Sequence, residues 1–260
     1  MKKYHLVFTS NFKNENPYLK EWIDYHLGVG VDHLYLFNQD GSKEADEIVN
    51  PYVKRGVVTV HPWTDFPPKY DQATYFFQKN KKHLAYMHAA EHYRHLTQWM
   101  LKIDLDEFLY LGDPTRTVKE YLHNINPSEH RSIRVPRFDF GSAGHDIKPE
   151  GPVTQNFMKR ESTHSNYKDM GNADFLNNNH YCHSSHRWSY QLFPRPGILE
   201  LTDPEGLRIN HYYTKSREEY FERQNISRGR RKSEADFQEI EKRTNQVEDK
   251  GMLRFGDLVE

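Results

Sequence analysis

Residues 99–108 read WMLKIDLDEF, and this stretch decides how the rest of the chain is interpreted. Its apolar part predicts a buried strand over 99–105 that leads directly into an acidic turn. Alternate side chains of a strand share one face, so Asp104 and Asp106 are expected to point the same way. Paired carboxylates repel each other unless a cation lies between them, and their oxygens suit Mg²⁺ or Mn²⁺ bound together with substrate phosphates. An isolated pair of this kind is more often a turn cap and a solvated side chain, but its position after the best predicted strand favours the functional interpretation.

Short apolar strands alternate with helical segments on the N-terminal side of this stretch. The predicted strands cover 4–9, 33–37 and 57–60, and the predicted helices cover 14–27, 45–52 and 73–96. Crossovers of this length predict an α/β fold with a mostly parallel central sheet flanked by helices. Because ligands of open α/β sheets bind beyond the carboxyl ends of the strands, segments 10–15, 38–42 and 104–107 are expected to face one cleft.

The C-terminal side of the stretch is less regular. The predicted elements are a strand at 132–140, a Gly-rich loop at 141–145, a polar, His-rich loop at 162–187, a strand at 207–213 and a charged helical region at 216–249 that opens with a capping box. We expect one domain over 1–260. It would comprise an N-terminal half at 1–112, a second half at 113–215 and a C-terminal helical region at 216–260.

The composition indicates a folded protein without a targeting segment. An aromatic content of 14% argues against disorder, and a net charge of −1 gives no field that would attract nucleic acid. Cys182 is the single cysteine, which excludes an intramolecular disulfide and is typical of a reducing compartment. The apolar runs are too short for a signal peptide or for the ~20 residues of a spanning helix. We therefore expect a cytoplasmic protein that can associate peripherally with the inner face of a membrane.

Four blocks of the sequence together resemble a known enzyme family. The blocks are NENPYLKEWIDYHLGVGVDHLYLFNQDGS at 14–42, WMLKIDLDEFLYL at 99–111, FDFGSAGH at 138–145 and INHYYTKSREEYFERQNISRGR at 209–230. Their combination resembles the GT-A glycosyltransferases of family 92 and their bacterial relatives near family 2. The resemblance implies a GT-A fold and inverting transfer of a hexose, galactose or glucose, from a UDP-sugar to a hydroxyl of a glycan or glycolipid. Surface polysaccharide or glycan synthesis is the process it implies.

The resemblance implies that 1–112 is the nucleotide-sugar-binding half and 113–215 the acceptor-side half. It also implies roles for individual residues. Asp104 and Asp106 match the DxD pair, Glu107 supports their turn, and His211 completes the shell of a bound Mn²⁺ or Mg²⁺. The nucleotide-sugar-binding residues that it implies are Asn14, Glu15, Asn38, Asp40, Asp104, Lys215, Arg228 and Arg230. The family usually has an aspartate at the position of Asn38.

An inverting transferase needs a base that deprotonates the acceptor hydroxyl. Asp139, His145 and Glu161 flank the Gly-rich loop that is expected over the acceptor side. They are the candidate catalytic residues, and the sequence leaves the choice among the three open.

Other classes of function stay open at this point. His180, Cys182, His183 and His186 could bind zinc in an interaction protein, although their spacing matches no standard finger. The basic run 228–232 could contact nucleic acid, against which the neutral overall charge argues. A metal-dependent nucleotidyltransferase or phosphotransferase would use the same two aspartates.

Overall fold

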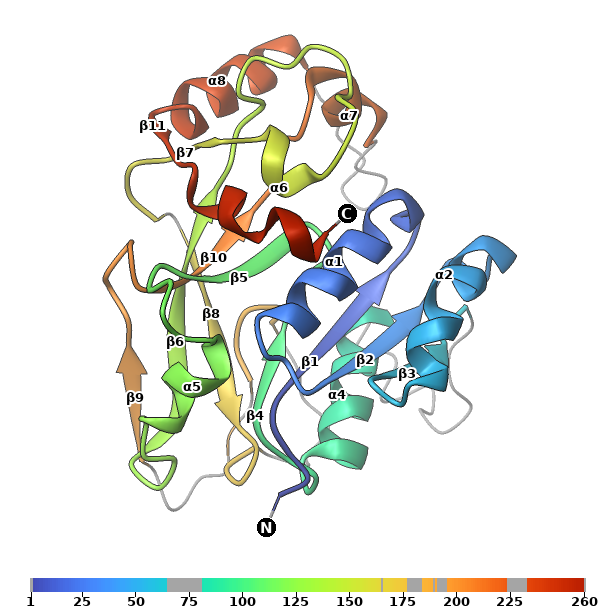
Figure 1. The fold of residues 1–260 in the computed structure, drawn as a ribbon, viewed down its shortest axis with the longest axis vertical. Helices are drawn as coiled ribbons and strands as arrows, with labels where there is room; N and C mark the ends of the chain where they lie inside the picture. The colour runs from blue at the N-terminus through green and yellow to red at the C-terminus, as the bar shows by residue number, and fades with distance from the viewer. Residues whose placement is uncertain are drawn as a thin grey trace.

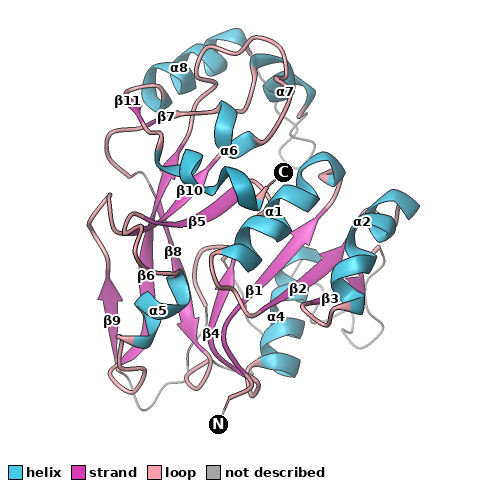
Figure 2. Ribbon diagram, viewed as in Figure 1, coloured by secondary structure: helices cyan, strands magenta, loops and turns pink. Residues whose placement is uncertain are grey.

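The computed structural model describes residues 2–64, 81–164, 166–176, 184–188, 190, 196–223 and 233–259. Its strands are β1 (Tyr4–Phe12), β2 (His33–Asn38), β3 (Val58–Pro62), β4 (Thr97–Lys102), β5 (Glu107–Leu111), β6 (His130–Asp139), β7 (Lys159–Arg160), β8 (Asn166–Asn172), β9 (Gly197–Glu200), β10 (Leu207–His211) and β11 (Val247–Glu248). Its helices are α1 (Asn16–Gly28), α2 (Lys43–Lys54), α4 (Lys81–Tyr93), α5 (Val118–His123), α6 (Val153–Asn156), α7 (Arg217–Glu222) and α8 (Glu234–Thr244), with a 3₁₀ segment η1 (Gly251–Leu258). Figures 1 and 2 show their arrangement.

A large sheet has the strand order β3-β2-β1-β4-β8-β6-β10-β5, with β9 beside β6. The first four strands are parallel, as predicted from the alternation of strands and helices. Beyond β4 the sheet is mixed, because β8 is antiparallel to both of its neighbours and β5 is antiparallel to β10. The mostly parallel sheet expected from the sequence thus describes the first half and not the second. The sequence of β8, NYKDMGN, lacks the apolar alternation that would have indicated a strand.

Several strands of this sheet have their carboxyl ends at the same edge. Since β8 is antiparallel to both β4 and β6, these two strands point the same way, and β10 is parallel to β6. The carboxyl ends of β1, β2, β4, β6 and β10 therefore meet at the same edge. The chain leaves β4 and crosses this edge to reach β5 at the far end of the sheet. That crossing places the acidic turn where open α/β sheets bind their ligands.

The parallel half is buried on both faces, as Figure 1 shows by the helices on either side of it. Leu6 and Phe8 of β1 pack in the core under α1, and Val7 between them packs in the core under α4. The same alternation holds along β2 and β4. Covering both faces is why these strands read as continuous apolar runs, and each fully buried large side chain contributes about 1.5–3 kcal/mol.

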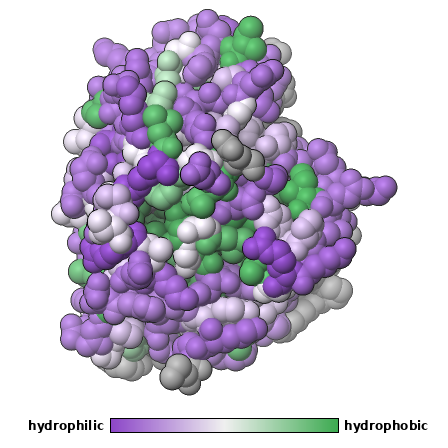
Figure 3. All heavy atoms as spheres, viewed as in Figure 1, coloured by the Kyte–Doolittle hydropathy of each residue, from purple (hydrophilic) through white to green (hydrophobic). Residues whose placement is uncertain are grey.

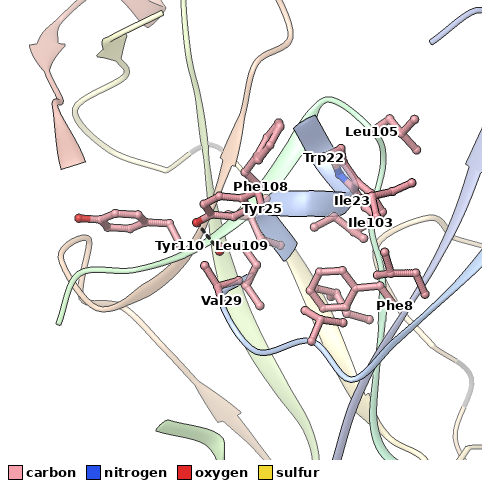
Figure 4. Close-up of a cluster of buried hydrophobic side chains, with 14 of the residues drawn as sticks. Phe8, Trp22, Ile23, Tyr25, Val29, Ile103, Leu105, Phe108, Leu109 and Tyr110 are labelled. Atoms are coloured by element: carbon pink, nitrogen blue, oxygen red, sulfur yellow. Dashed lines mark hydrogen bonds between the residues drawn. The ribbon is translucent and has the colours of Figure 1, made fainter. Parts of the chain in front are cut away.

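Helix α1 connects the core to the acidic turn. It begins with a proline in its first turn, and Leu19, Trp22, Ile23 and His26 form its buried face at helical spacing. Figure 4 shows this core, with the Tyr25 hydroxyl donating to the carbonyl of Leu109 at 3.0 Å. The first helix is thereby fixed to β5, the strand that follows the acidic turn.

The charged C-terminal region forms two helices in the part that the structure describes. The predicted capping box at Ser216 and Glu219 is confirmed at the start of α7, and α8 has a second one at Ser233 and Asp236. After α8 the chain returns through η1, which packs against α1. Figure 3 shows a largely hydrophilic surface with apolar residues gathered near the middle of that face. Among the described residues, no helix has the length and apolar character needed to cross a membrane.

Candidate active site

An open cavity of about 830 Å³ lies at the carboxyl ends of the strands. This volume is within the range of small-molecule sites. Its lining comes from the ends of β1, β6 and β10, the start of β8, the acidic turn, and helices α4 and α8. The lining residues are Asn11, Phe12, Lys13, Glu15, Gln39, Lys82, Asp104, Leu105, Asp106, Arg137, Asp139, Asn166, His186, His211, Tyr213, Arg223, Ile240 and Arg243.

The acidic segment is a turn and not the end of a strand. β4 ends at Lys102, and the amide of Glu107 donates to the carbonyl of Asp104 at 3.0 Å. The Asp104 amide donates to Oε2 of Glu107 at 2.9 Å, so Glu107 supports the turn. The indole of Trp22 donates to the carbonyls of Asp104 and Glu107 at 3.1 and 2.9 Å. Asp104 and Asp106 both line the cavity, as expected. They are oriented by this hydrogen-bonded turn and not by the alternation of side chains along a strand.

Two lysines from distant parts of the chain hold Asp104. Lys82 of α4 pairs with Oδ1, and Nζ of Lys168 in β8 lies 3.3 Å from Oδ2. Lys168 is itself buried and also pairs with Glu107. Burial alone would raise the pKa of Asp104, but Lys168 and Lys82 hold that pKa well below its usual range. Asp104 is therefore ionised, with protein cations on both of its oxygens.

Asp106 is held by a different set of cations. Nη1 of Arg223, just after α7, lies 2.9 Å from Oδ2 of Asp106, and Nε2 of His211 lies 3.6 Å from the same oxygen. Arg223 also reaches Glu15, with Nη2 3.2 Å from Oε1. Burial opposes ionisation of Asp106, yet His211 and Arg223 lower its pKa. Burial raises the pKa of Glu15 in spite of Arg223. One guanidinium thus bridges the first loop and the acidic turn.

Asp139 orients the ring of His211. Nδ1 of His211 donates to Oδ1 of Asp139 at 2.7 Å, and this bond directs Nε2 towards Asp106. Arg243 and Arg137 also approach Asp139, at 3.0 and 3.4 Å. Burial would raise the pKa of Asp139, but His211 and the two arginines lower it to about 2. Burial favours the neutral ring of His211 and would lower its pKa. Asp106 and Asp139 outweigh burial and raise this pKa to about 9.

The predicted three-residue metal shell is not assembled in the part of the chain that the structure describes. Within it, no three His, Cys, Asp or Glu side chains are arranged to hold a metal ion. Asp106 and His211 approach each other, but Lys82 and Lys168 occupy both oxygens of Asp104. Two carboxylates in an open cavity still fit a cation that takes its other ligands from substrate phosphates and water, which is the common arrangement for Mg²⁺.

The family model described as glycosyltransferase family 92 matches residues 7–248, which include all of the described residues that line the cavity. The chain belongs to glycosyltransferase family 92. This agrees with the resemblance of the four sequence blocks.

Several plant proteins are similar to this chain. A glycosyltransferase family 92 protein of Oryza sativa subsp. japonica is 24% identical over 178 residues, 68% of this chain and 28% of that protein. One of Ricinus communis is 23% identical over 218 residues, 81% of this chain and 36% of that protein. A galactan beta-1,4-galactosyltransferase of Arabidopsis thaliana is 28% identical over 133 residues, 49% of this chain and 24% of that protein. The chain thus spans about a quarter to a third of the length of these relatives.

Three predicted nucleotide contacts lie outside the cavity lining of this family 92 chain. Oδ1 of Asn38 accepts from the amides of Asp40 and Gly41 at 2.9 and 3.0 Å, so Asn38 forms the turn after β2. Asp40 accepts from a serine hydroxyl in the same turn. Asn14 is exposed, with a left-handed φ of 57°. In this region Gln39 lines the cavity and donates to the Asn11 side chain at 2.8 Å.

Lys215 lies behind the cavity wall. Its side chain is 2% exposed. Its Nζ lies 3.7 Å from Oε2 of Glu15 and 3.1 Å from the ring centre of Tyr18. Its φ of 51° is a conformation that non-glycine residues adopt at a cost. Burial and the nearby Arg223 lower the pKa of Lys215 to about 8. Lys215 is therefore a neighbour of Glu15, which lines the cavity, and does not itself line it.

Two of the three candidate bases do not reach the cavity. The ring of His145 packs on Phe157, with ring centres 5.5 Å apart. Glu161 accepts from the amide of Asp139 at 2.9 Å and pairs with Arg243 at 2.5 Å. Asp139 alone of the three lines the cavity, and its low pKa makes it a weak proton acceptor.

Some predictions fall outside the described residues, namely Arg228, Arg230 and the members His180, Cys182 and His183 of the proposed zinc set. The fourth member, His186, lies in the cavity wall. Sequence reasoning missed the roles of Lys82, Arg137, Lys168, Arg223 and Arg243 at the two aspartates and Asp139. Arg223 lies within the fourth block, so its charge near the end of α7 was the one available signal.

Proposed function

We propose that the chain is an inverting glycosyltransferase that moves a hexose, galactose or glucose, from a UDP-sugar to a hydroxyl of a glycan or glycolipid. The observation that carries the proposal is the ionised pair Asp104 and Asp106 in an open cavity at the carboxyl ends of the strands. Membership of family 92 supports the reaction class. The similarity to a galactan beta-1,4-galactosyltransferase favours galactose as the sugar.

We assign the donor nucleoside to the side of the cavity formed by β1 and β2. Asn11, Phe12 and Gln39 provide an amide, an aromatic ring and a second amide there. A base and a ribose need such polar partners beside an apolar surface. The acceptor then enters from the side of β6 and β8, where Asn166 and His186 line the wall.

Lys82 and Arg223 are suited to bind the diphosphate. Each ends on a carboxylate of the acidic turn and lines the cavity. A diphosphate that enters the cavity competes with these carboxylates for the two cations, and charge-assisted bonds to phosphate oxygens are strong. The two side chains can thus neutralise charge that develops on the leaving group.

Asp104 and Asp106 are the residues that would hold Mn²⁺ or Mg²⁺. When bound, such a cation offsets the negative charge of the departing diphosphate. His211 is kept beside Asp106 by its bond to Asp139, and it would contribute Nε2 after losing its proton. We further propose a cytoplasmic enzyme that can associate peripherally with the inner face of a membrane and that acts in surface polysaccharide or glycan synthesis.

Calorimetric titration tests this function. UDP, UDP-galactose, UDP-glucose and GDP-mannose are titrated with and without Mn²⁺ into the wild type, Asp106→Asn and the control Asp257→Asn, whose side chain is exposed in η1. We expect uridine nucleotides to bind more tightly with Mn²⁺, and Asp106→Asn alone to lose that dependence. Equal binding of all nucleotides, or none, would contradict the donor assignment. Transfer of the nucleotidyl or phosphoryl group instead of the hexose, seen by mass spectrometry of the products, would favour the alternative use of the aspartates.

A further inference from the structure

Most groups in the cavity that could accept a proton are already engaged. Among the described lining residues, each of the carboxylates of Glu15, Asp104, Asp106 and Asp139 pairs with at least one arginine, lysine or histidine. Both ring nitrogens of His211 face carboxylates. A group that deprotonates an acceptor hydroxyl must hold an available lone pair, and pairing with a cation makes a carboxylate a weaker base. Burial raises the pKa of Glu15, but Glu15 follows β1, on the side of the cavity assigned to the donor.

His186 presents such a lone pair. Its ring lines the cavity, and Nδ1 lies 2.9 Å from the carbonyl oxygen of Tyr167. A carbonyl can only accept, so Nδ1 carries the proton of the neutral ring and Nε2 carries the lone pair. No hydrogen bond to Nε2 is found within the described part of the chain. The tautomer is therefore fixed by a backbone atom that cannot titrate.

The backbone of His186 is anchored beside β8. Its amide donates to Oγ of Ser184 at 3.0 Å, and its carbonyl accepts from the amide of Asp169 at 2.7 Å. With the ring bond to Tyr167, two hydrogen bonds hold the residue on β8, and the bond to Ser184 fixes the loop around it. A catalytic group must be held in a fixed position relative to the reacting atom, and these hydrogen bonds fix the position of His186.

The surroundings of His186 favour the neutral ring. Burial, and then the cations Lys168 and Arg137, lower the pKa of His186 to about 4, while Glu107 and Asp104 partly oppose them. At neutral pH the imidazole is therefore unprotonated and Nε2 keeps its lone pair, while the lowered pKa makes this ring a weaker base than a free histidine. The same charges allow the imidazolium, once formed, to lose its proton readily to water.

We propose that His186 is the general base of the transfer. This inference rests on the proposed function. The acceptor oxygen forms a bond to the anomeric carbon while its proton moves to Nε2 of His186. The bond from that carbon to the diphosphate breaks, and the diphosphate leaves with the electron pair. His186 thus takes the role that the sequence assigned to Asp139, His145 or Glu161.

The test separates chemistry from donor binding. Release of UDP from the nucleotide sugar that binds in the titration is measured with water as the acceptor, for the wild type, His186→Asn and the control His95→Asn. His95 is an exposed histidine between α4 and β4. Asparagine can still donate to the Tyr167 carbonyl, so His186→Asn is expected to fold with an unchanged melting midpoint. We expect kcat to fall roughly 10²- to 10⁴-fold in His186→Asn while the donor Kd changes less than twofold.

Chemical rescue provides a second readout. Imidazole added to His186→Ala should raise kcat at least tenfold and leave His95→Ala unchanged, because it replaces the missing base in the space of the ring. A kcat of His186→Asn within threefold of the wild type, or a loss of donor affinity in folded His186→Asn, would overturn the role of His186. So would a lack of rescue. A wild type that binds no nucleotide sugar would instead refute the proposed function, and the base with it.

Discussion

Replacing Lys168 by methionine tests whether the buried ion pairs under the acidic turn stabilise the fold. Side chains of Lys168 and Glu107 are 1% and 0% exposed, and they pair directly. Removing one partner of a buried pair costs about 3–5 kcal/mol, because the other charge stays buried. Arg137 still lies 3.3 Å from Glu107, and Lys82 still pairs with Asp104. We therefore expect a loss near the lower end, about 3 kcal/mol, which for a chain of this size lowers Tm by roughly 6–12 °C.

Urea unfolding followed by tryptophan fluorescence measures this loss, and a double-mutant cycle assigns it. Glu107→Gln removes the charge that Lys168 compensates, so the double variant should be more stable than the sum of the single losses predicts, by about 1–3 kcal/mol. Lys242→Met, at an exposed site on α8, should stay within about 0.5 kcal/mol of the wild type. A loss below 1 kcal/mol for Lys168→Met, or additive losses in the cycle, would refute the reasoning.

Three further outcomes are expected. Burial lowers the pKa of His26 to about 3, below its unfolded value of 6.5. The contribution of His26 to stability is therefore present above pH 6.5 and is lost as the pH falls. Unfolding free energies measured between pH 4 and 7 should change by up to about 1.4 kcal/mol per pH unit because of this group, and His26→Gln should remove that part of the slope. Gly112→Ala would place Cβ 1.7 Å from the carbonyl oxygen of Glu205, so a loss of about 2–3 kcal/mol is expected in urea unfolding, and wild-type stability would contradict the close approach. Asn38→Ala removes two turn hydrogen bonds and should cost about 1–3 kcal/mol without changing the UDP-sugar Kd in calorimetry, whereas weaker donor binding would restore the role that the sequence implied.

Local sequence patterns predicted the parallel half of the fold because each of its strands is covered on both faces. Burial of that kind leaves continuous apolar runs, and these set off β1, β2 and β4 from the helices between them. β8 gave no such signal, since two of its buried side chains, Lys168 and Asp169, are charged and pair with residues far along the chain. A polar strand stabilised by tertiary ion pairs looks like a loop in sequence.

The candidate site was predictable where it depends on one short segment. Asp104 and Asp106 are neighbours in sequence, and the strand before them placed them at the correct edge of the sheet. Their partners Lys82 and Arg223 come from two other elements, and no local pattern records that pairing. Asn38 was predicted to contact the nucleotide because it stands where the family usually has an aspartate, and an asparagine that forms a turn looks the same in sequence as one that binds a ligand. Only the backbone amides that it accepts from distinguish the two.

The position of β5 also bears on the order in which the protein folds. β5 leaves the acidic turn and hydrogen-bonds to β10, with Glu107 opposite His211 and Leu111 opposite Leu207, about one hundred residues later in the chain. The amide of Tyr212 then donates to the carbonyl of Asp106 at 2.7 Å. The acidic turn can therefore reach its final shape only after the ribosome has made β10, although the parallel half is complete much earlier. Closing such a long loop slows folding, so we expect the donor pocket to be among the last parts of a newly made chain to form.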